Sequence, residues 1–208
     1  MENELRRDRI EEICTMLDVW AAALAKNEEI SPPVASKELE ILIFQLLVHN
    51  HSLWNQEDFA RRRDVQDSAI VAAKRAIDTL NQQRNDTIEK IDMWLLENYY
   101  KQLGERELPL RTETPGSALD RLCILSLKIY YMSDQTRRTD VDTAHREACS
   151  RKLEILKRQQ KNLQDALKEL IESLNRGSIK MMIYRQFKMY NDPTLNPQIY
   201  SPQSTKKM

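Results

Sequence analysis

Apolar side chains recur at intervals of three and four residues along most of this chain, which is the spacing of amphipathic helices. The pattern predicts five helical segments, at about residues 3–26, 34–63, 67–103, 114–133 and 140–177. Pro32, Pro33 and Pro109 lie between segments, and Gly177 is typical of the residue just beyond a helix end. We therefore predict an all-α fold: an antiparallel bundle of about five helices, three of them long, with an irregular C-terminal tail.

The last predicted helix carries a row of leucines in which Gln160 is the one polar member. The row consists of Leu153, Leu156, Gln160, Leu163, Leu167, Leu170 and Leu174. Such a 4-3 spacing packs against neighbouring helices along its length, and a single polar member can fix the register. Beyond it, basic residues interleave with aromatic and methionine side chains among turn signals. We predict a bundle domain at 1–177 and a basic, aromatic tail at 178–208.

Polar side chains interrupt the apolar stripes of three predicted helices. The stripe of segment 34–63 runs on through Asn50, Trp54, Glu57 and Arg61. Arg84 falls at the centre of the stripe of segment 67–103, and Asp120 lies on that of segment 114–133. A solvated face would place such residues opposite the stripe. Because an unpaired charge inside a core costs several kcal/mol, we expect these side chains to meet in a polar cluster between helices.

This predicted cluster has the composition of a ligand pocket. The expected ligand-binding residues are Asn50, Trp54, Glu57, Asp58, Arg61, Arg84, Asn85, Asp120, Arg121 and Lys128. Arginine and lysine bind phosphate, and the indole of Trp54 offers a flat face to a sugar ring. Bundles commonly bind ligands between their helices. A cluster of this kind can also fix helix register without binding anything.

A second interpretation uses the carboxylates as ligands of Mg²⁺. Glu57, Asp58, Glu89 and Asp92 fall on consecutive predicted helices, and Glu89 and Asp92 lie on neighbouring turns. That set would suit a magnesium-dependent nucleotide or phosphate hydrolase. Carboxylates at this spacing are common on solvated helices, so our first expectation is no metal and no cofactor. The sequence lacks a Walker loop, a dinucleotide fingerprint and paired Glu-x-x-His motifs. These residues do not decide whether the protein is an enzyme.

Composition narrows the class of protein further. Only 3 glycines and 7 prolines are too few for a β-sandwich or barrel. The formal net charge is zero, which argues against nucleic acid as a partner. We find no secretion signal and no stretch long enough to span a membrane. Cys14, Cys123 and Cys149 lack metal or disulfide spacing, so we expect reduced thiols and a cytoplasmic protein. Free N–H groups at Gly116 could hold an anion, although ordinary helix capping is favoured.

Three strings together carry a resemblance to a known family. They are LWNQEDFAR at 53–61, NQQRND at 81–86 followed by IEKID at 88–92, and TETPGSALDRL at 112–122. With them the chain resembles, over about residues 5–195, the bacterial family called domain of unknown function 4254. Its hallmark Arg-Asn-Asp matches 84–86, and its Asp-Arg-Leu matches 120–122.

That resemblance supplies no activity. The same strings are similar to those of helical proteins found beside glycosyltransferases of cell-surface polysaccharide synthesis, which implies a sugar-nucleotide context and a glycosyltransferase as partner. Three hypotheses stay open: a binding protein with a charged pocket for a phosphorylated or sugar-type ligand, a magnesium-dependent hydrolase, and a scaffold. In the scaffold hypothesis the leucine row of the last helix engages a second copy, giving a homodimer.

Overall fold

The computed structural model describes residues 5–32, 37–103, 107–189 and 192–200. Its α-helices are α1 (Arg7–Ala25), α2 (Glu38–Phe59), α3 (Asp67–Leu95), α4 (Pro115–Thr136), α5 (Thr143–Asn175) and the single turn α6 (Pro197–Tyr200). Among these residues no strand forms, and one isolated bridge joins Leu110 to Lys180. The predicted all-α bundle with long helices is confirmed.

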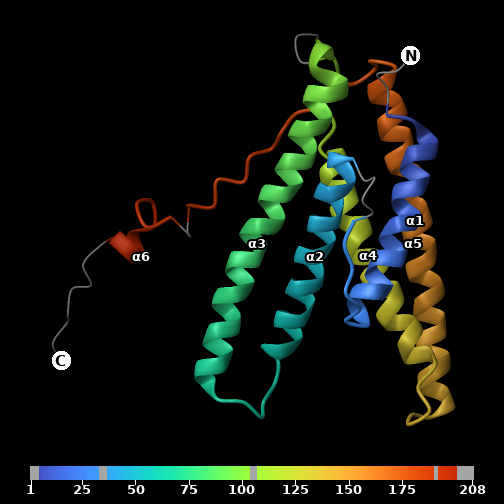
Figure 1. Cartoon of the computed structure of the whole chain (residues 1–208), viewed down its shortest axis with the longest axis vertical. Helices are drawn as coiled ribbons and strands as arrows, with labels where there is room; N and C mark the ends of the chain where they lie inside the picture. Colours follow the sequence, from blue (N-terminus) through green and yellow to red (C-terminus); the bar gives the residue numbers. More distant parts are fainter. Residues whose placement is uncertain (1–4, 33–36, 104–106, 190–191, 201–208) are drawn as a thin grey trace.

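Four of the five long helices form two hairpins, and the fifth, α1, packs between them. α2 packs along α3, α4 packs along α5, and α1 contacts α2, α4 and α5. The two hairpins lie close at the end where α4 begins and diverge toward their loops, so the tip of the α2–α3 hairpin extends away from α4 and α5 (Figure 1). Residues near that tip therefore have fewer helices around them than residues of the same face further up.

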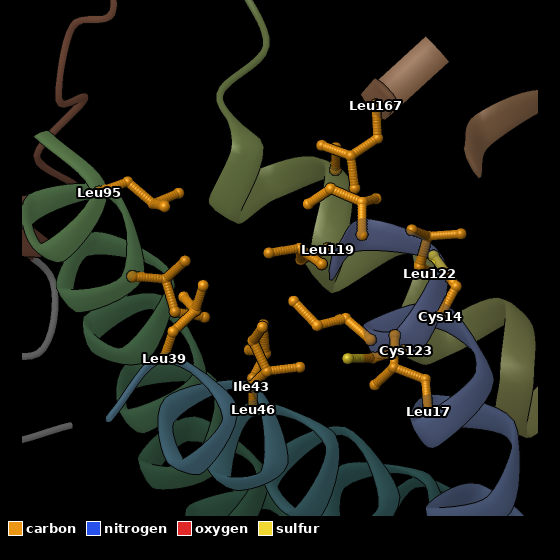
Figure 2. Close-up of a cluster of buried hydrophobic side chains, with 14 of the residues drawn as sticks. Cys14, Leu17, Leu39, Ile43, Leu46, Leu95, Leu119, Leu122, Cys123 and Leu167 are labelled. Carbon is orange, nitrogen blue, oxygen red and sulfur yellow. The ribbon is translucent and has the colours of Figure 1, made fainter. Parts of the chain in front are cut away.

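The hydrophobic core sits where all five helices meet. Leu39, Ile43 and Leu46 from α2 face Leu119, Leu122 and Cys123 from α4, with Leu17 of α1, Leu95 of α3 and Leu167 of α5 around them (Figure 2). Ile13, Ile43, Leu46 and Leu47 are completely inaccessible to solvent. All three cysteines are free and buried, as expected of reduced thiols.

Local sequence signals set the helix ends. Thr114 caps α4 by accepting the Ser117 N–H (3.2 Å), and Pro115 takes the first helical position. Asp142 caps α5, and Gly177 follows it with a φ of 62°, a conformation that favours glycine.

The third helix is shorter than predicted. α3 ends at Leu95 and continues as a π-helical turn (Leu96–Tyr100) and a 3-10 turn (Lys101–Leu103) instead of running to residue 103 as α-helix. Tyr100 at the end of the wide turn is almost fully buried, and its hydroxyl donates to Asn175 Oδ1 (3.0 Å). Packing against the end of α5 thus overrides the helical pattern here.

Gln160 links three helices at the middle of the leucine row. Its side-chain amide donates to Asp18 Oδ1 of α1 (2.7 Å) and to Ser126 Oγ of α4 (3.1 Å). Ser126 in turn donates to Asp18 (2.6 Å). The polar member of the row is therefore bonded to both neighbouring helices.

Candidate functional site

Three of the predicted site residues meet inside the bundle. Arg84 of α3 donates through Nε to Asp120 Oδ1 of α4 (2.7 Å) and through Nη2 to Asp120 Oδ2. Asn50 of α2 donates to the same Oδ1 (2.9 Å) and to Leu46 O (3.0 Å). We call Asn50, Arg84 and Asp120 the three-helix clamp. Asp120 is only 4% exposed, so the clamp ties α2, α3 and α4 at a fixed register.

The clamp is closed within the protein. Asp120 accepts two bonds from Arg84 and one from Asn50, which uses most of its acceptor capacity. The Asp120 carboxylate raises the pKa of the Arg84 guanidinium further, so this side chain stays charged. Among the described residues, no buried side-chain nitrogen or oxygen lacks a hydrogen-bond partner. The clamp therefore needs no ligand to complete it.

The expectation that Glu57, Asp58 and Arg61 join this cluster is wrong. Glu57 pairs with Arg61, just past the end of the same helix (2.9 Å), and their side chains are 45% and 68% exposed. Asp58 is exposed as well. These residues lie at or beyond the end of α2, where the hairpin has left the rest of the bundle (Figure 1). The stripe continues to the end of α2, but α4 and α5 no longer lie beside the helix there to bury it (Figure 1).

Trp54 lies between the clamp and that exposed tip. Its ring stacks on Tyr131 of α4, with centroids 4.9 Å apart and planes 14° from parallel. The Tyr131 hydroxyl lies 3.2 Å from Nε2 of His51, a buried residue. Burial raises the pKa of Tyr131 and lowers that of His51. Tyr131 therefore covers one face of the Trp54 indole, which was predicted to pack against a sugar ring.

Asn85, another predicted site residue, is half-buried on α3.

Arg121 and Lys128 point out of the bundle, which corrects their predicted place. Both are exposed on α4, where Arg121 pairs with Glu113 (2.6 Å). Within the described part of the chain, Lys128 has no ion-pair partner. Successive residues of a helix point about 100° apart, so Arg121 points to solvent although the preceding Asp120 points into the bundle.

Arg121 and Lys128 line a groove of about 580 Å³ between α4 and α5, which we call the α4–α5 groove. Its lining residues are Glu113, Arg121, Ile124, Leu125, Lys128, Gln159, Asn162, Leu163 and Ala166. Two basic side chains, the carboxylate of Glu113 and two amides thus surround an apolar floor. The pattern of α4 could have indicated this groove, because Arg121 and Lys128 are seven residues apart and share one face.

The carboxylates of the alternative magnesium set lie apart. Glu57 pairs with Arg61, Glu89 accepts the backbone N–H of Gln186 (2.8 Å), and Asp92 accepts the backbone N–H of Gly116 (2.7 Å). In the described ranges, no three His, Cys, Asp or Glu side chains gather into a set that could hold a metal ion. Their geometry gives the hydrolase hypothesis no support.

Asp92 serves instead as a buried cap for α4. It is 3% exposed, and burial raises its pKa to about 6 although hydrogen bonds from Thr114 and Gly116 act in the opposite direction. The N–H groups at Gly116 are thus used in capping, as favoured from the sequence.

Asp92 predicts a pH dependence of stability. The pKa of Asp92 is raised in the folded state, so the protonated side chain stabilises the fold. This contribution to the free energy of unfolding is fully present below the ordinary pKa of 3.8 and is lost as pH rises through about 6. Asp92→Asn removes this loss, because the amide oxygen can still accept from Gly116. We expect the stability of the variant relative to the wild type to improve by about 2 kcal/mol between pH 4.5 and 7.5. Urea unfolding at both pH values measures it, and a pH-independent difference would contradict the assignment.

Two further ion pairs, each with one buried partner, were not predicted. Glu40 of α2 is 2% exposed and pairs with Arg9 of α1, and Lys168 of α5 is 7% exposed and pairs with Glu11 of α1 (2.6 Å). Glu40 interrupts the apolar stretch 39–48, and Lys168 directly follows Leu167 of the leucine row. A charge at such a position was the sequence signal that could have indicated each pair. Both pairs join α1 to another helix and are structural in character.

In the described part of the chain, none of the helices has the length and apolar content needed to cross a membrane. The comparison with curated proteins found no match, and neither did the comparison with solved structures. A family model described as protein of unknown function (DUF4254) matches residues 40–183, which is more than half of the chain and includes the clamp and the α4–α5 groove. The chain therefore belongs to the DUF4254 family.

Proposed function

We propose that this protein is a binding protein that takes a phosphorylated, hydroxyl-bearing ligand of the sugar-phosphate class in the α4–α5 groove. The observation that carries the proposal is the pair Arg121 and Lys128 on one face of α4, at the edge of a groove with an apolar floor. The clamp then serves as the structural support that fixes α4.

The two cations are placed to share one anionic group or two adjacent ones. Seven residues along α4 correspond to a rise of about 10 Å, and both side chains are long enough to converge over the groove. Arg121 is held by Glu113 in an exposed pair worth no more than about 1 kcal/mol, which an incoming phosphate can replace. Lys128 carries no such partner within the described residues and is available directly.

The remaining lining suits the uncharged part of such a ligand. Gln159 and Asn162 of α5 bring amides that can both donate to and accept from hydroxyl groups. Ile124, Leu125 and Leu163 give the apolar surface against which a ring can pack. Together with the glycan-synthesis context of the sequence resemblance, these groups make a nucleotide sugar the first ligand to test, with an accessory role beside a cytoplasmic glycosyltransferase.

Calorimetric titration tests the proposal with UDP-glucose, pyrophosphate and free glucose as separate probes. We expect UDP-glucose to bind without added metal, and Arg121→Met/Lys128→Met to weaken it at least tenfold, because each lost charge-assisted bond is worth about 1.5–3 kcal/mol. Arg151→Met/Lys157→Met removes the same charge from exposed α5 positions outside the groove and should bind like the wild type. Equal loss in both double variants, or no binding of any probe, would contradict the proposal.

A further inference from the structure

The chain after α5 leaves its own bundle. We call residues 180–200 the C-terminal arm, of which 180–189 and 192–200 are described. Its first part follows the bundle: the Lys180 N–H donates to Pro109 O (3.0 Å), and the Gln186 N–H donates to Glu89 on α3 (2.8 Å). Beyond Gln186 the arm runs outward past α3 to α6 (Figure 1). Turns there are closed by bonds within the arm, such as Asn196 N–H to Asp192 O (2.9 Å).

This arm exposes an unusual amount of apolar surface. Its exposed large side chains are Met182, Tyr184, Phe187, Met189, Leu195 and Ile199, between 46% and 79% accessible. Phe187 is the most exposed of them at 79%. Single exposed apolar residues need no explanation, but a series of them along one segment, four of them beyond Gln186, indicates a surface that another molecule covers.

Charge indicates which molecule that is. The arm, residues 180–200, contains three basic and one acidic side chain, a net charge of +2; residues 180–208 together carry +4, and the whole chain is neutral. Residues 1–179 therefore carry −4. The arm is complementary in charge to the bundle of this same protein, which favours a second copy as its partner.

A pocket of about 300 Å³ on the bundle fits the most exposed part of the arm. It lies between α4 and α5 beside the α4–α5 groove, and Leu163, Ala166, Leu167 and Leu170 form its apolar wall. Its carboxylates are Glu113, which Arg121 neutralises, and the exposed Glu169, which has no ion-pair partner among the described residues; Arg111 also lines it. Phe187 is flanked in sequence by Arg185 and Lys188, so an aromatic ring with cations beside it would meet apolar walls with a free carboxylate at the edge.

We propose that two copies of this protein exchange their C-terminal arms, with Phe187 of each copy inserted into the α4–α5 pocket of the other and Arg185 or Lys188 next to Glu169. Within one copy, the bond from Gln186 to Glu89 holds the neighbouring Phe187 on the α3 side of the bundle. Because Phe187 directly follows this anchor, the second bundle lies beside α3 when its pocket receives the ring. Reciprocal exchange buries the same surfaces on both copies and closes as a two-fold dimer.

Sedimentation velocity over a range of concentrations tests the exchange in the full chain. We expect a dimer for the wild type, and Phe187→Asp to raise the dimer dissociation constant at least tenfold. Glu169→Lys should weaken the dimer as well, and combining it with Lys188→Glu should restore most of the affinity. Lys157→Glu alters charge on an exposed part of α5 outside the pocket and serves as the control.

A photo-crosslinking residue at position 187 gives the second readout. The expected product joins two chains, with the crosslink on the 163–170 segment of α5. A wild type that is monomeric at all concentrations, a crosslink within one chain, or an arm that instead sediments with phosphatidylglycerol vesicles would each overturn the proposal. The pocket shares Glu113, Leu163 and Ala166 with the α4–α5 groove, but Arg121 and Lys128 line only the groove. Lys128 makes no ion pair with a pocket residue within the described part of the chain, so Lys128→Met should weaken binding of the proposed ligand and leave the dimer intact, which separates the two proposals.

Discussion

Arg84→Met should destabilise the protein by about 3 kcal/mol, because breaking a buried ion pair by removing one partner leaves the other charge uncompensated. Asp120 would keep only its bond from Asn50 while remaining 4% exposed. The Arg84 side chain is 25% exposed, which places the expected loss at the lower end of the range for buried pairs. Chemical unfolding of the variant at neutral pH measures the loss.

Two further variants make this result specific to the clamp. Arg84→Met/Asp120→Leu removes both charges and should recover most of the lost stability, since an apolar pair of similar volume can replace a buried ion pair. Arg121→Met removes the neighbouring arginine, whose exposed pair with Glu113 should contribute less than about 1 kcal/mol. If Arg84→Met and Arg121→Met lower the free energy of unfolding equally, the clamp does not hold the bundle together.

Gly116→Ala should destabilise the protein by about 1–3 kcal/mol, although alanine ordinarily favours a helix over glycine by about 1 kcal/mol. A Cβ at this position would lie 2.7 Å from Asp92 Oδ1 and 2.8 Å from the backbone oxygen of Ile88. The Asp92 side chain can rotate away, but the Ile88 carbonyl belongs to α3 and cannot yield without moving the helix. The start of α4 is thus pressed against α3, and only glycine fits between them.

Thermal unfolding of Gly116→Ala, alone and combined with Asp92→Asn, checks the sign of this effect. The double variant should remain less stable than Asp92→Asn alone, because the contact with the Ile88 carbonyl persists. A stabilised Gly116→Ala, as expected for an open helix, would show that α3 and α4 do not approach so closely.

The clamp could be predicted from the sequence because each member stands on an apolar stripe. Asn50, Arg84 and Asp120 interrupt three separate helices at positions where burial was expected, and a buried charge requires a partner. The same rule failed at Glu57 and Arg61. Periodicity gives the direction of a side chain but does not show where a helix loses its neighbours, and here α2 runs beyond the bundle.

Other features depend on packing that periodicity does not reveal. Arg121 and Lys128 were expected in the interior cluster, yet the position of α5 decides that their side of α4 opens into a groove. The π-helical turn at Leu96–Tyr100 has no sequence signature and follows from the fit of Tyr100 against Asn175. The role of Asp92 likewise depends on the close approach of Gly116.

The central claim is that the interior charges hold the bundle together and the outward charges of α4 bind the ligand. Amide chemical-shift mapping of the 24.5 kDa protein during titration with UDP-glucose tests it directly. The account predicts shifts concentrated at Arg121, Lys128, Gln159 and Asn162, with the amides of Asn50, Arg84 and Asp120 unchanged. Shifts concentrated at those three interior residues, or no shifts at millimolar UDP-glucose, would contradict it.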